Sequence, residues 1–257
     1  KASNTSASTT SLTVTITSAT ANNLLIAVHH CGNVIANVTG PSGWTRVTGA
    51  TLDQGGDESI AIWYKVAAGG ETSANWQTPA AVRHMAGVFE YSGLETASVA
   101  DASAALGSGA GTTVTSQSTG TTGTTVQADE LAIAGRDAVA GGTTSTTWSN
   151  SFVAEQDIGA GRLNTASKIL AATGTVETTA SWTTAREALA AVATFKATTV
   201  LTIATNALSA PATVNNPTVT PGSVTVSTNA LTASVTLYNP SVAYGIATNA
   251  LDASATL

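Results

Sequence analysis

Residues 71–91 read ETSANWQTPAAVRHMAGVFEY, and residues 176–196 read VETTASWTTAREALAAVATFK. Three residues of the first stretch recur in the second at one offset of 106 residues: Glu71 as Glu177, Trp76 as Trp182 and Phe89 as Phe195. Upstream, NNLLIAV at 22–28 resembles ADELAIA at 128–134, and YKVAA at 64–68 resembles SKILA at 167–171. Residues 1–197 are therefore interpreted as two related halves, about 1–106 and 107–197.

Short apolar or alternating runs, separated by glycine-rich breaks, predict strands in each half. LTVTIT at 12–17 alternates apolar and polar residues, and LLIAV at 24–28 is continuously apolar. REALAAVATF at 186–195 has helical propensity, but its counterpart VRHMAGVFEY contains a glycine, so we predict strands for both. Since no amphipathic helix separates the strands, we expect an all-β fold, an antiparallel β-sandwich that is jelly-roll-like and internally duplicated.

Charge and composition exclude several classes of protein. Only 9% of the 257 residues are charged, against roughly 25% in ordinary soluble domains, which argues against a charge-rich disordered chain or a helical bundle. The net charge is −6 and no basic cluster is present, so we expect no nucleic-acid partner. No apolar run approaches about 18 residues, so we expect no membrane insertion. Cys31 is the one cysteine, which excludes an intrachain disulfide.

A second repeat occupies residues 198–257. The tetrapeptide TNAL begins at Thr205, Thr228 and Thr248, and Asn-Pro recurs at Asn216 and Asn239. One short unit cannot bury an apolar face alone, so we expect these units to form a β-repeat stalk by stacking along the chain or across chains. The last copy stops in mid-unit at Leu257, which favours a longer polypeptide. Asp252 is the one charged residue in 197–257, so few charges protect the strand edges from pairing.

Histidine and cysteine residues are the first candidates for metal or thiol chemistry. If 24–31 is a strand, His29 and Cys31 share one face and His30 lies on the other. His84 could supply a further ligand, but no CxxC or HxH spacing supports a site with three or four ligands. We therefore predict a strand end with a partly buried thiol, and no metal or other cofactor.

Acidic residues are the next candidates. Asp53, Asp57 and Glu58 lie in the loop LDQGGDES, which lacks the carboxylate spacing of an EF-hand, so we interpret it as a plain hairpin loop. Glu90, Glu95 and Asp101 could supply paired carboxylates for glycoside hydrolysis, but Lys196 stands at the duplicated position of Glu90. We interpret these acids as solvated surface. GSGAG at 107–111 lacks the features of a phosphate loop and is interpreted as the linker between the halves.

Aromatic residues could contact sugars. Trp44, Trp76, Trp148 and Trp182 occupy duplicated positions, which is typical of core anchors. Trp63 and Tyr64 have no counterpart in the second half. Neighbours on a strand face opposite ways, so we expect one of the two to point outward and predict it as a glycan contact.

The pattern of NLLIAV at 23–28, GWTRV at 43–47, AIWYKVAAGGE at 61–71 and GVFEYSGL at 87–94 resembles β-sandwich domains of bacteriophage tail, fibre and other virion proteins and of some bacterial surface proteins. The resemblance covers about residues 10–197, and the TNAL repeats resemble short β repeats of phage fibres. It implies a structural or receptor-facing protein located on a virion or an extracellular surface.

The sequence thus predicts a non-enzymatic structural component of a virion, such as a tail fibre, a tail protein or a capsid decoration. Its expected partners are other copies of itself and other virion proteins, with a trimer implied by the resemblance to fibres, and host surface glycans. The alternative is a glycan-binding or adhesin module on a cell surface or fibre tip, with specificity carried by the sandwich loops. A hydrolase of host polysaccharide is a third hypothesis, which requires a cleft with two convergent carboxylates.

Overall fold

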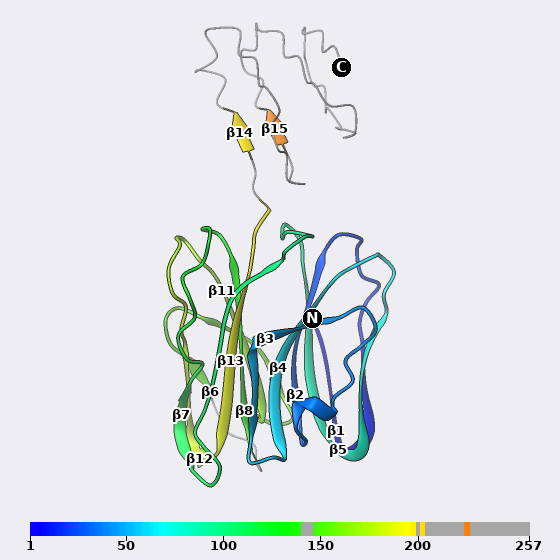
Figure 1. Cartoon of the computed structure of the whole chain (residues 1–257), viewed down its shortest axis with the longest axis vertical. Coiled ribbons are helices and arrows are strands. Elements are labelled where there is room, and N and C mark those ends of the chain that lie inside the picture. The colour runs from blue at the N-terminus through cyan, green and yellow to red at the C-terminus, as the bar shows by residue number, and fades with distance from the viewer. Residues whose placement is uncertain (140–145, 199–200, 204–223, 227–257) are drawn as a thin grey trace, which may run out of the picture. The chain divides into compact units, whose positions relative to one another are not determined.

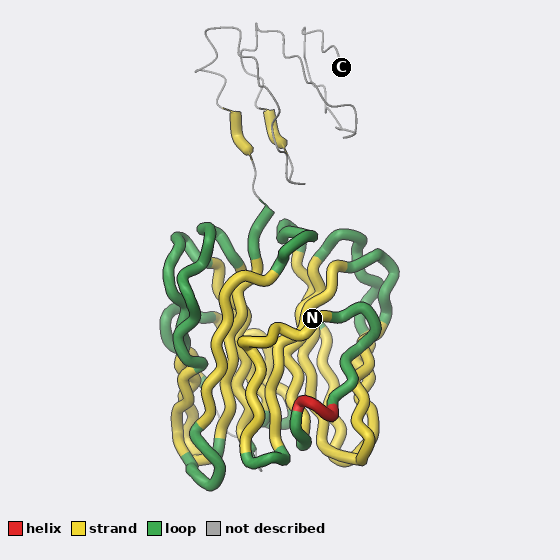
Figure 2. Tube along the Cα trace, viewed as in Figure 1, coloured by secondary structure: helices red, strands yellow, loops and turns green. Residues whose placement is uncertain are grey.

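The computed structural model describes residues 1–139, 146–198, 201–203 and 224–226. Residues Lys1–Ala197 form one compact unit, and Thr198–Leu257 form a second. The described part of the first unit consists of antiparallel strands, and its only helical segment is the 3₁₀ turn η1 (Ile35–Asn37) (Figure 2). The all-β prediction is confirmed. No helix in the described ranges is long and apolar enough to cross a membrane.

Two five-stranded sheets and one three-stranded sheet build this unit (Figure 1). The first sheet has the order β1 (Ala2–Thr15), β5 (Ser73–Tyr91), β2 (Leu24–Cys31), β4 (Glu58–Val66), β3 (Thr45–Gln54). The second has the order β6 (Ala100–Gly107), β13 (Ala188–Phe195), β8 (Leu131–Ala138), β11 (Leu163–Ile169), β10 (Val153–Ile158). The third has the order β7 (Val114–Ser118), β12 (Thr179–Arg186), β9 (Thr147–Trp148). Each half of the duplication thus contributes one five-stranded sheet.

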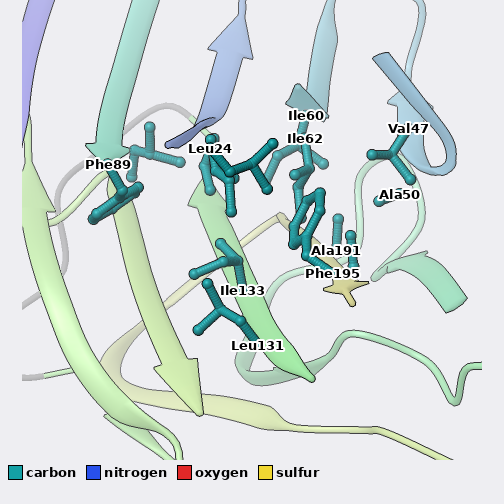
Figure 3. Close-up of a cluster of buried hydrophobic side chains, with 14 of the residues drawn as sticks. Leu24, Val47, Ala50, Ile60, Ile62, Phe89, Leu131, Ile133, Ala191 and Phe195 are labelled. Atoms are coloured by element: carbon teal, nitrogen blue, oxygen red, sulfur yellow. The ribbon is translucent and has the colours of Figure 1, made fainter. Parts of the chain in front are cut away.

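The main core lies between the two five-stranded sheets. Leu24, Ile62 and Phe89 of the first sheet pack against Ile133 and Phe195 of the second (Figure 3). Every residue of β2, β8 and β13 is buried, because these central strands are covered on both faces. The sequence 186–195, which could have formed a helix, is a central strand from Ala188 onward, so the strand prediction is confirmed.

An additional layer covers the outer face of each five-stranded sheet. In the first half, residues 11–15 of β1 pair with residues 73–77 of β5, and Thr39 bridges to Gln77. Trp76 from this ribbon is fully buried and belongs to the same core cluster as Ala27 of β2. In the second half the three-stranded sheet has this role, and Trp182 is buried there. The prediction that the duplicated Trp76 and Trp182 are core anchors is confirmed.

The two halves are arranged with approximate twofold symmetry. Strand β1 of the first sheet contacts β10 of the second, and β3 contacts β6. Counted along the chain within each five-stranded sheet, β1 and β6 are the first strands and β3 and β10 are the third, so the first strand of each sheet lies against the third strand of the other. Gln156 in β10, for example, donates a hydrogen bond of 3.2 Å from its side chain to the Ala2 carbonyl in β1. An isologous dimer has the same reciprocal arrangement. One chain therefore contains the equivalent of a dimer interface.

The boundary between the halves lies earlier than the sequence repeat predicted. Strand β6 (Ala100–Gly107) pairs with β13 and so belongs to the second sheet. The prediction that GSGAG links the halves is wrong, because it connects β6 to β7 inside the second half. The following Thr-rich segment contains β7, which lies at an edge of the three-stranded sheet.

In the second unit, β14 (Leu201–Ile203) pairs in parallel with β15 (Val224–Val226). The register matches Leu201 with Val224, a separation of 23 residues. The first two TNAL copies begin at Thr205 and Thr228 and have the same separation. The TNAL and Asn-Pro positions themselves lie outside the described residues.

Candidate functional site

A buried group of three ionisable side chains joins the two halves. His30 lies near the end of β2, Glu58 begins β4, and Asp137 lies near the end of β8. Nδ1 of His30 is 3.1 Å from Oδ2 of Asp137, and its Nε2 is 3.3 Å from Oε2 of Glu58. The side chains of His30 and Asp137 are 1% and 0% exposed to solvent, and that of Glu58 is 15% exposed. The imidazole thus has one carboxylate at each nitrogen.

Burial and neighbouring charges change the pKa of two members of this group. Burial lowers the pKa of His30, but the Asp137 carboxylate, with help from Glu58, outweighs this effect, so the pKa is raised overall. For Glu58, burial raises the pKa to about 7, despite the opposing effect of His30. Arg83, half-buried on β5, acts electrostatically on both groups and lowers both pKa values. The arrangement favours a protonated imidazole between the carboxylates.

The same three residues are suited to hold a cation. One donor atom from each lies within 4.8 Å of the other two. Imidazole nitrogen and carboxylate oxygen are both common ligands of divalent metals. Glu58 belonged to the acidic loop considered from the sequence, and His30 was considered separately. Asp137 was missed, because it lies in the other half and carries no spacing signal.

A pair of histidines, His29 and His84, lies on the opposite face of the first sheet. Nε2 of His29 is 3.2 Å from Nδ1 of His84, whose Nε2 is 3.1 Å from the Thr78 hydroxyl. The His29 ring stacks on Trp76 with centroids 5.1 Å apart. Burial is the main cause that lowers the pKa of His29 well below its usual value and that of His84 to about 4. Both rings are therefore neutral at pH 7.

The predicted alternation along 24–31 is confirmed. Cys31 packs in the outer core cluster, on the face of His29, whereas His30 lies on the face between the five-stranded sheets. The Cys31 thiol is buried, and burial raises its pKa to about 12, so it is a poor nucleophile. His84 does lie close to His29, but these two residues are not part of the three-residue group.

The expectation that Trp63 or Tyr64 points outward is not met. Trp63 is 6% exposed in the outer core cluster, with the Arg46 guanidinium 5.7 Å from its ring centre. Tyr64 is half-buried and packs edge-on against Phe195 at 5.8 Å. Other parts of the protein cover both faces of β4, so neither Trp63 on one face nor Tyr64 on the other points freely into solvent. Glycan contact by Tyr64 stays a prediction.

The other acidic candidates mainly hold backbone groups. Oδ1 of Asp53 accepts a hydrogen bond of 2.7 Å from the Ile35 amide, and Oε1 of Glu90 accepts one of 2.8 Å from Thr20. Oδ2 of Asp101 accepts one of 2.8 Å from Val126. Glu95 is 9% exposed, so the expectation of a solvated surface is wrong for this residue. Asp57 is exposed in the loop between β3 and β4.

A buried arginine marks the second half. The Arg136 guanidinium lies 4.4 Å from the Trp182 ring centre, and it donates to the Gly161 carbonyl and to the Asn164 side chain. Sequence reasoning did not single it out, although a charged residue inside the apolar run LAIAGRDA is a signal that could have done so.

A polar depression of about 400 Å³ lies on the same half. Asn150, Ser151, Lys168 and Glu177 contribute polar groups to its wall. Lys168 donates a hydrogen bond of 2.8 Å from Nζ to the Asn150 carbonyl, and the Asn150 side chain donates to the Glu177 carbonyl at 2.8 Å. The wall is therefore preorganised by contacts within the protein.

Comparison with known proteins gives no relative: no family model matches the chain, and no curated protein or solved structure has significant similarity to it.

Proposed function

We propose that this protein is a non-enzymatic structural component of a bacteriophage virion, which displays a duplicated β-sandwich on an oligomeric stalk of β repeats. A tail fibre, a tail protein and a capsid decoration all fit this description. The observation that carries the proposal is the division of the chain into a compact unit, Lys1–Ala197, and a region whose described strands pair in parallel at the interval of the sequence repeat.

The connectivity of the second half supports a jelly-roll-like unit. In the second half the chain passes from the large sheet (β6) to the outer layer (β7), back (β8) and out again (β9). After the β10–β11 hairpin it returns to the outer layer in β12 and ends in the large sheet in β13. Such alternation between two sheets is typical of jelly rolls, a fold that is common in capsid and lectin domains.

The composition and the strand pairing of the second unit support a stalk. Parallel stacking of identical repeats pairs the backbone groups of each unit with the next and leaves a pairing edge at the end of the stack. Residues 197–257 carry one charge, so little repulsion opposes the pairing of that edge with another copy. Self-association is the expected consequence, and a trimer is the state that the resemblance to fibres implies.

Two features of the first unit support a structural role over an enzymatic one. Glu90 and Asp101, which could have formed a catalytic pair, each accept hydrogen bonds from backbone amides. The Cys31 thiol is buried and protonated. These groups have structural partners, and their contacts account for their positions without a reaction.

Immunogold labelling tests the proposed location. Antibodies against residues 1–197 would be applied to purified phage particles and to cells from the source of this sequence. We expect gold on the particles. Gold on the cell surface, with particles unlabelled, would contradict the virion assignment and favour the adhesin alternative.

The alternative function, a glycan-binding module, is favoured by the polar depression at Lys168. Its volume lies within the range of small-molecule sites, and its wall offers donors and acceptors of the kind that bind sugar hydroxyls. A glycan array with the full chain tests it. Binding that Lys168→Ala abolishes and Tyr64→Ala preserves would place the site in the depression, whereas the reverse result would place it at Tyr64. Absence of glycan binding would exclude this alternative.

A further inference from the structure

We infer that His30, Glu58 and Asp137 form a Zn²⁺ site that fastens the two halves of the sandwich together. Two ligands come from the first sheet, on β2 and β4, and the third comes from the second sheet, on β8. The inference concerns the first unit alone and is independent of the proposed function.

Several buried nitrogen and oxygen atoms of this group lack hydrogen-bond partners. Both carboxylate oxygens of Asp137, both ring nitrogens of His30 and Oε2 of Glu58 are buried without a hydrogen-bond partner, apart from the ion pairs within the group. A buried carboxylate ordinarily accepts several hydrogen bonds, and leaving this capacity unused costs free energy. A metal ion would use the lone pairs of all three residues at once.

The ligand atoms of the three residues and their spacing suit Zn²⁺. Zn²⁺ takes imidazole nitrogen and carboxylate oxygen at about 2.0–2.2 Å, which in a tetrahedral site places neighbouring ligand atoms about 3.3 Å apart. The 3.1 Å between Nδ1 of His30 and Oδ2 of Asp137 is close to that spacing, whereas Glu58 lies 3.3 Å from the other ring nitrogen. Three protein ligands leave one position for water or a further donor.

The position of the imidazole determines which side chain must move. His30 has a carboxylate at each nitrogen, so a cation held by one nitrogen requires the other carboxylate to turn towards it. Glu58 is free to do so, since its side chain has three rotatable bonds and is 15% exposed. The same exposure gives the ion a path from solvent. Asp137, fully buried, is the fixed ligand.

Nearby charge provides a further check. Arg83, the half-buried cation beside the group, opposes a second positive charge. Asp57 is exposed and next to Glu58 in sequence, and it adds negative charge without reaching the group of three. Removal of the Arg83 charge should therefore strengthen Zn²⁺ binding, and removal of the Asp57 charge should weaken it only slightly.

The test is calorimetric titration of ZnCl₂ into the chelator-treated full chain, with thermal unfolding as a second measurement. We expect one Zn²⁺ per chain, affinity reduced at least about 10-fold in Glu58→Gln and in Asp137→Asn, and affinity within about threefold of the original in Asp57→Asn. Arg83→Gln should bind more tightly. Zn²⁺ should raise the unfolding temperature of the original chain and not that of Glu58→Gln.

His84→Gln separates this site from the other histidine pair, and it should keep full Zn²⁺ binding. If Asp137→Asn fails to fold, Glu58→Gln, altered at a partly exposed position, decides the question alone. The inference would be overturned if the original chain bound no Zn²⁺, or if Glu58→Gln bound it equally well. The group would then be an ion-pair clamp held by a proton on His30.

Discussion

Gly135 in β8 faces Val28 of β2 across the interface between the two five-stranded sheets. A Cβ atom at Gly135 would lie 2.3 Å from Cγ1 of Val28 and 3.5 Å from Cδ1 of Ile60. Gly87 in β5 is similarly restricted, because a Cβ there would lie 2.3 Å from Oε1 of Gln156. The absence of side chains at these two positions lets the sheets approach each other closely.

We predict that Gly135→Ala destabilises the protein by about 1–3 kcal/mol, the usual cost of adding a methyl group to a filled core. Urea unfolding of the full chain would measure the change in the free energy of unfolding. Gly123→Ala is the control, since nothing lies within 4 Å of a Cβ at that position. Equal stability of the two variants would contradict this account of the interface.

The buried pair of His29 and His84 predicts loss of stability in acid. The pKa of His84 is lowered to about 4, against about 6.5 in the unfolded chain, so the unfolded state binds more protons between these values. This contribution is complete above pH 6.5 and is lost as the pH falls towards 4, by about 2–3 kcal/mol at pH 4.5. Denaturant unfolding at pH 7 and pH 4.5 would measure it.

His84→Gln is the variant that isolates this effect, because glutamine can still hydrogen-bond but does not titrate in this range. Its stability should fall less than that of the original chain between pH 7 and pH 4.5. Parallel pH profiles for the two proteins would show that His84 does not carry the dependence.

Strand alternation was sufficient to place His29 and Cys31 on one face and His30 on the other. It could not identify the partners of His30, because Asp137 lies in the other half and meets it only when the two sheets pack. The same limit explains Trp63: the sequence shows which face of β4 a side chain takes, but not that the segment from η1 to Gly40 covers that face, where a Cβ on Gly40 would lie 2.3 Å from the Trp63 ring.

At the scale of elements, pairing on both sides overrides local propensity. REALAAVATF contains good helix formers, yet β13 pairs with β6 on one side and with β8 on the other. The expected strands at 12–17, 24–28 and in 71–91 were recognisable because apolar residues and glycine breaks define them. Strand β6, ADASAALG, has no such pattern, which explains why the boundary between the halves was misplaced.

The difference in burial between Phe195 in β13 and Ile169 in β11 predicts that truncating these two side chains has very different effects on stability. Phe195 is fully buried and contacts Tyr64 of the opposite sheet, so Phe195→Ala should cost about 3–5 kcal/mol. Ile169 at the end of β11 is 70% exposed, and Ile169→Ala should change stability by less than about 0.5 kcal/mol. Urea unfolding of both variants checks the contrast, and similar costs would contradict the assignment of the core.

At the scale of the whole molecule, the first unit is a pseudo-dimer made by one chain. Each half presents one apolar sheet face to the other, and the reciprocal contacts of β1 with β10 and of β3 with β6 repeat across the pseudo-twofold axis. The three-residue group breaks this symmetry. His30 pairs with Met85 in the first half, and Gly135 pairs with Ala191 at the corresponding position of the second half, so the second half has glycine where the first has histidine. The apolar faces of the two sheets are thus buried within one chain, and we propose that assembly involves the second unit instead.

The mass in solution tests the central claim, that the repeats assemble the protein and the sandwich is the displayed unit. Light scattering after size exclusion would be measured for the full chain and for residues 1–197. We expect a multiple of 25.4 kDa for the full chain and a monomer for the truncated one. Monomers in both cases would contradict it, and an oligomer of residues 1–197 would transfer assembly to the sandwich.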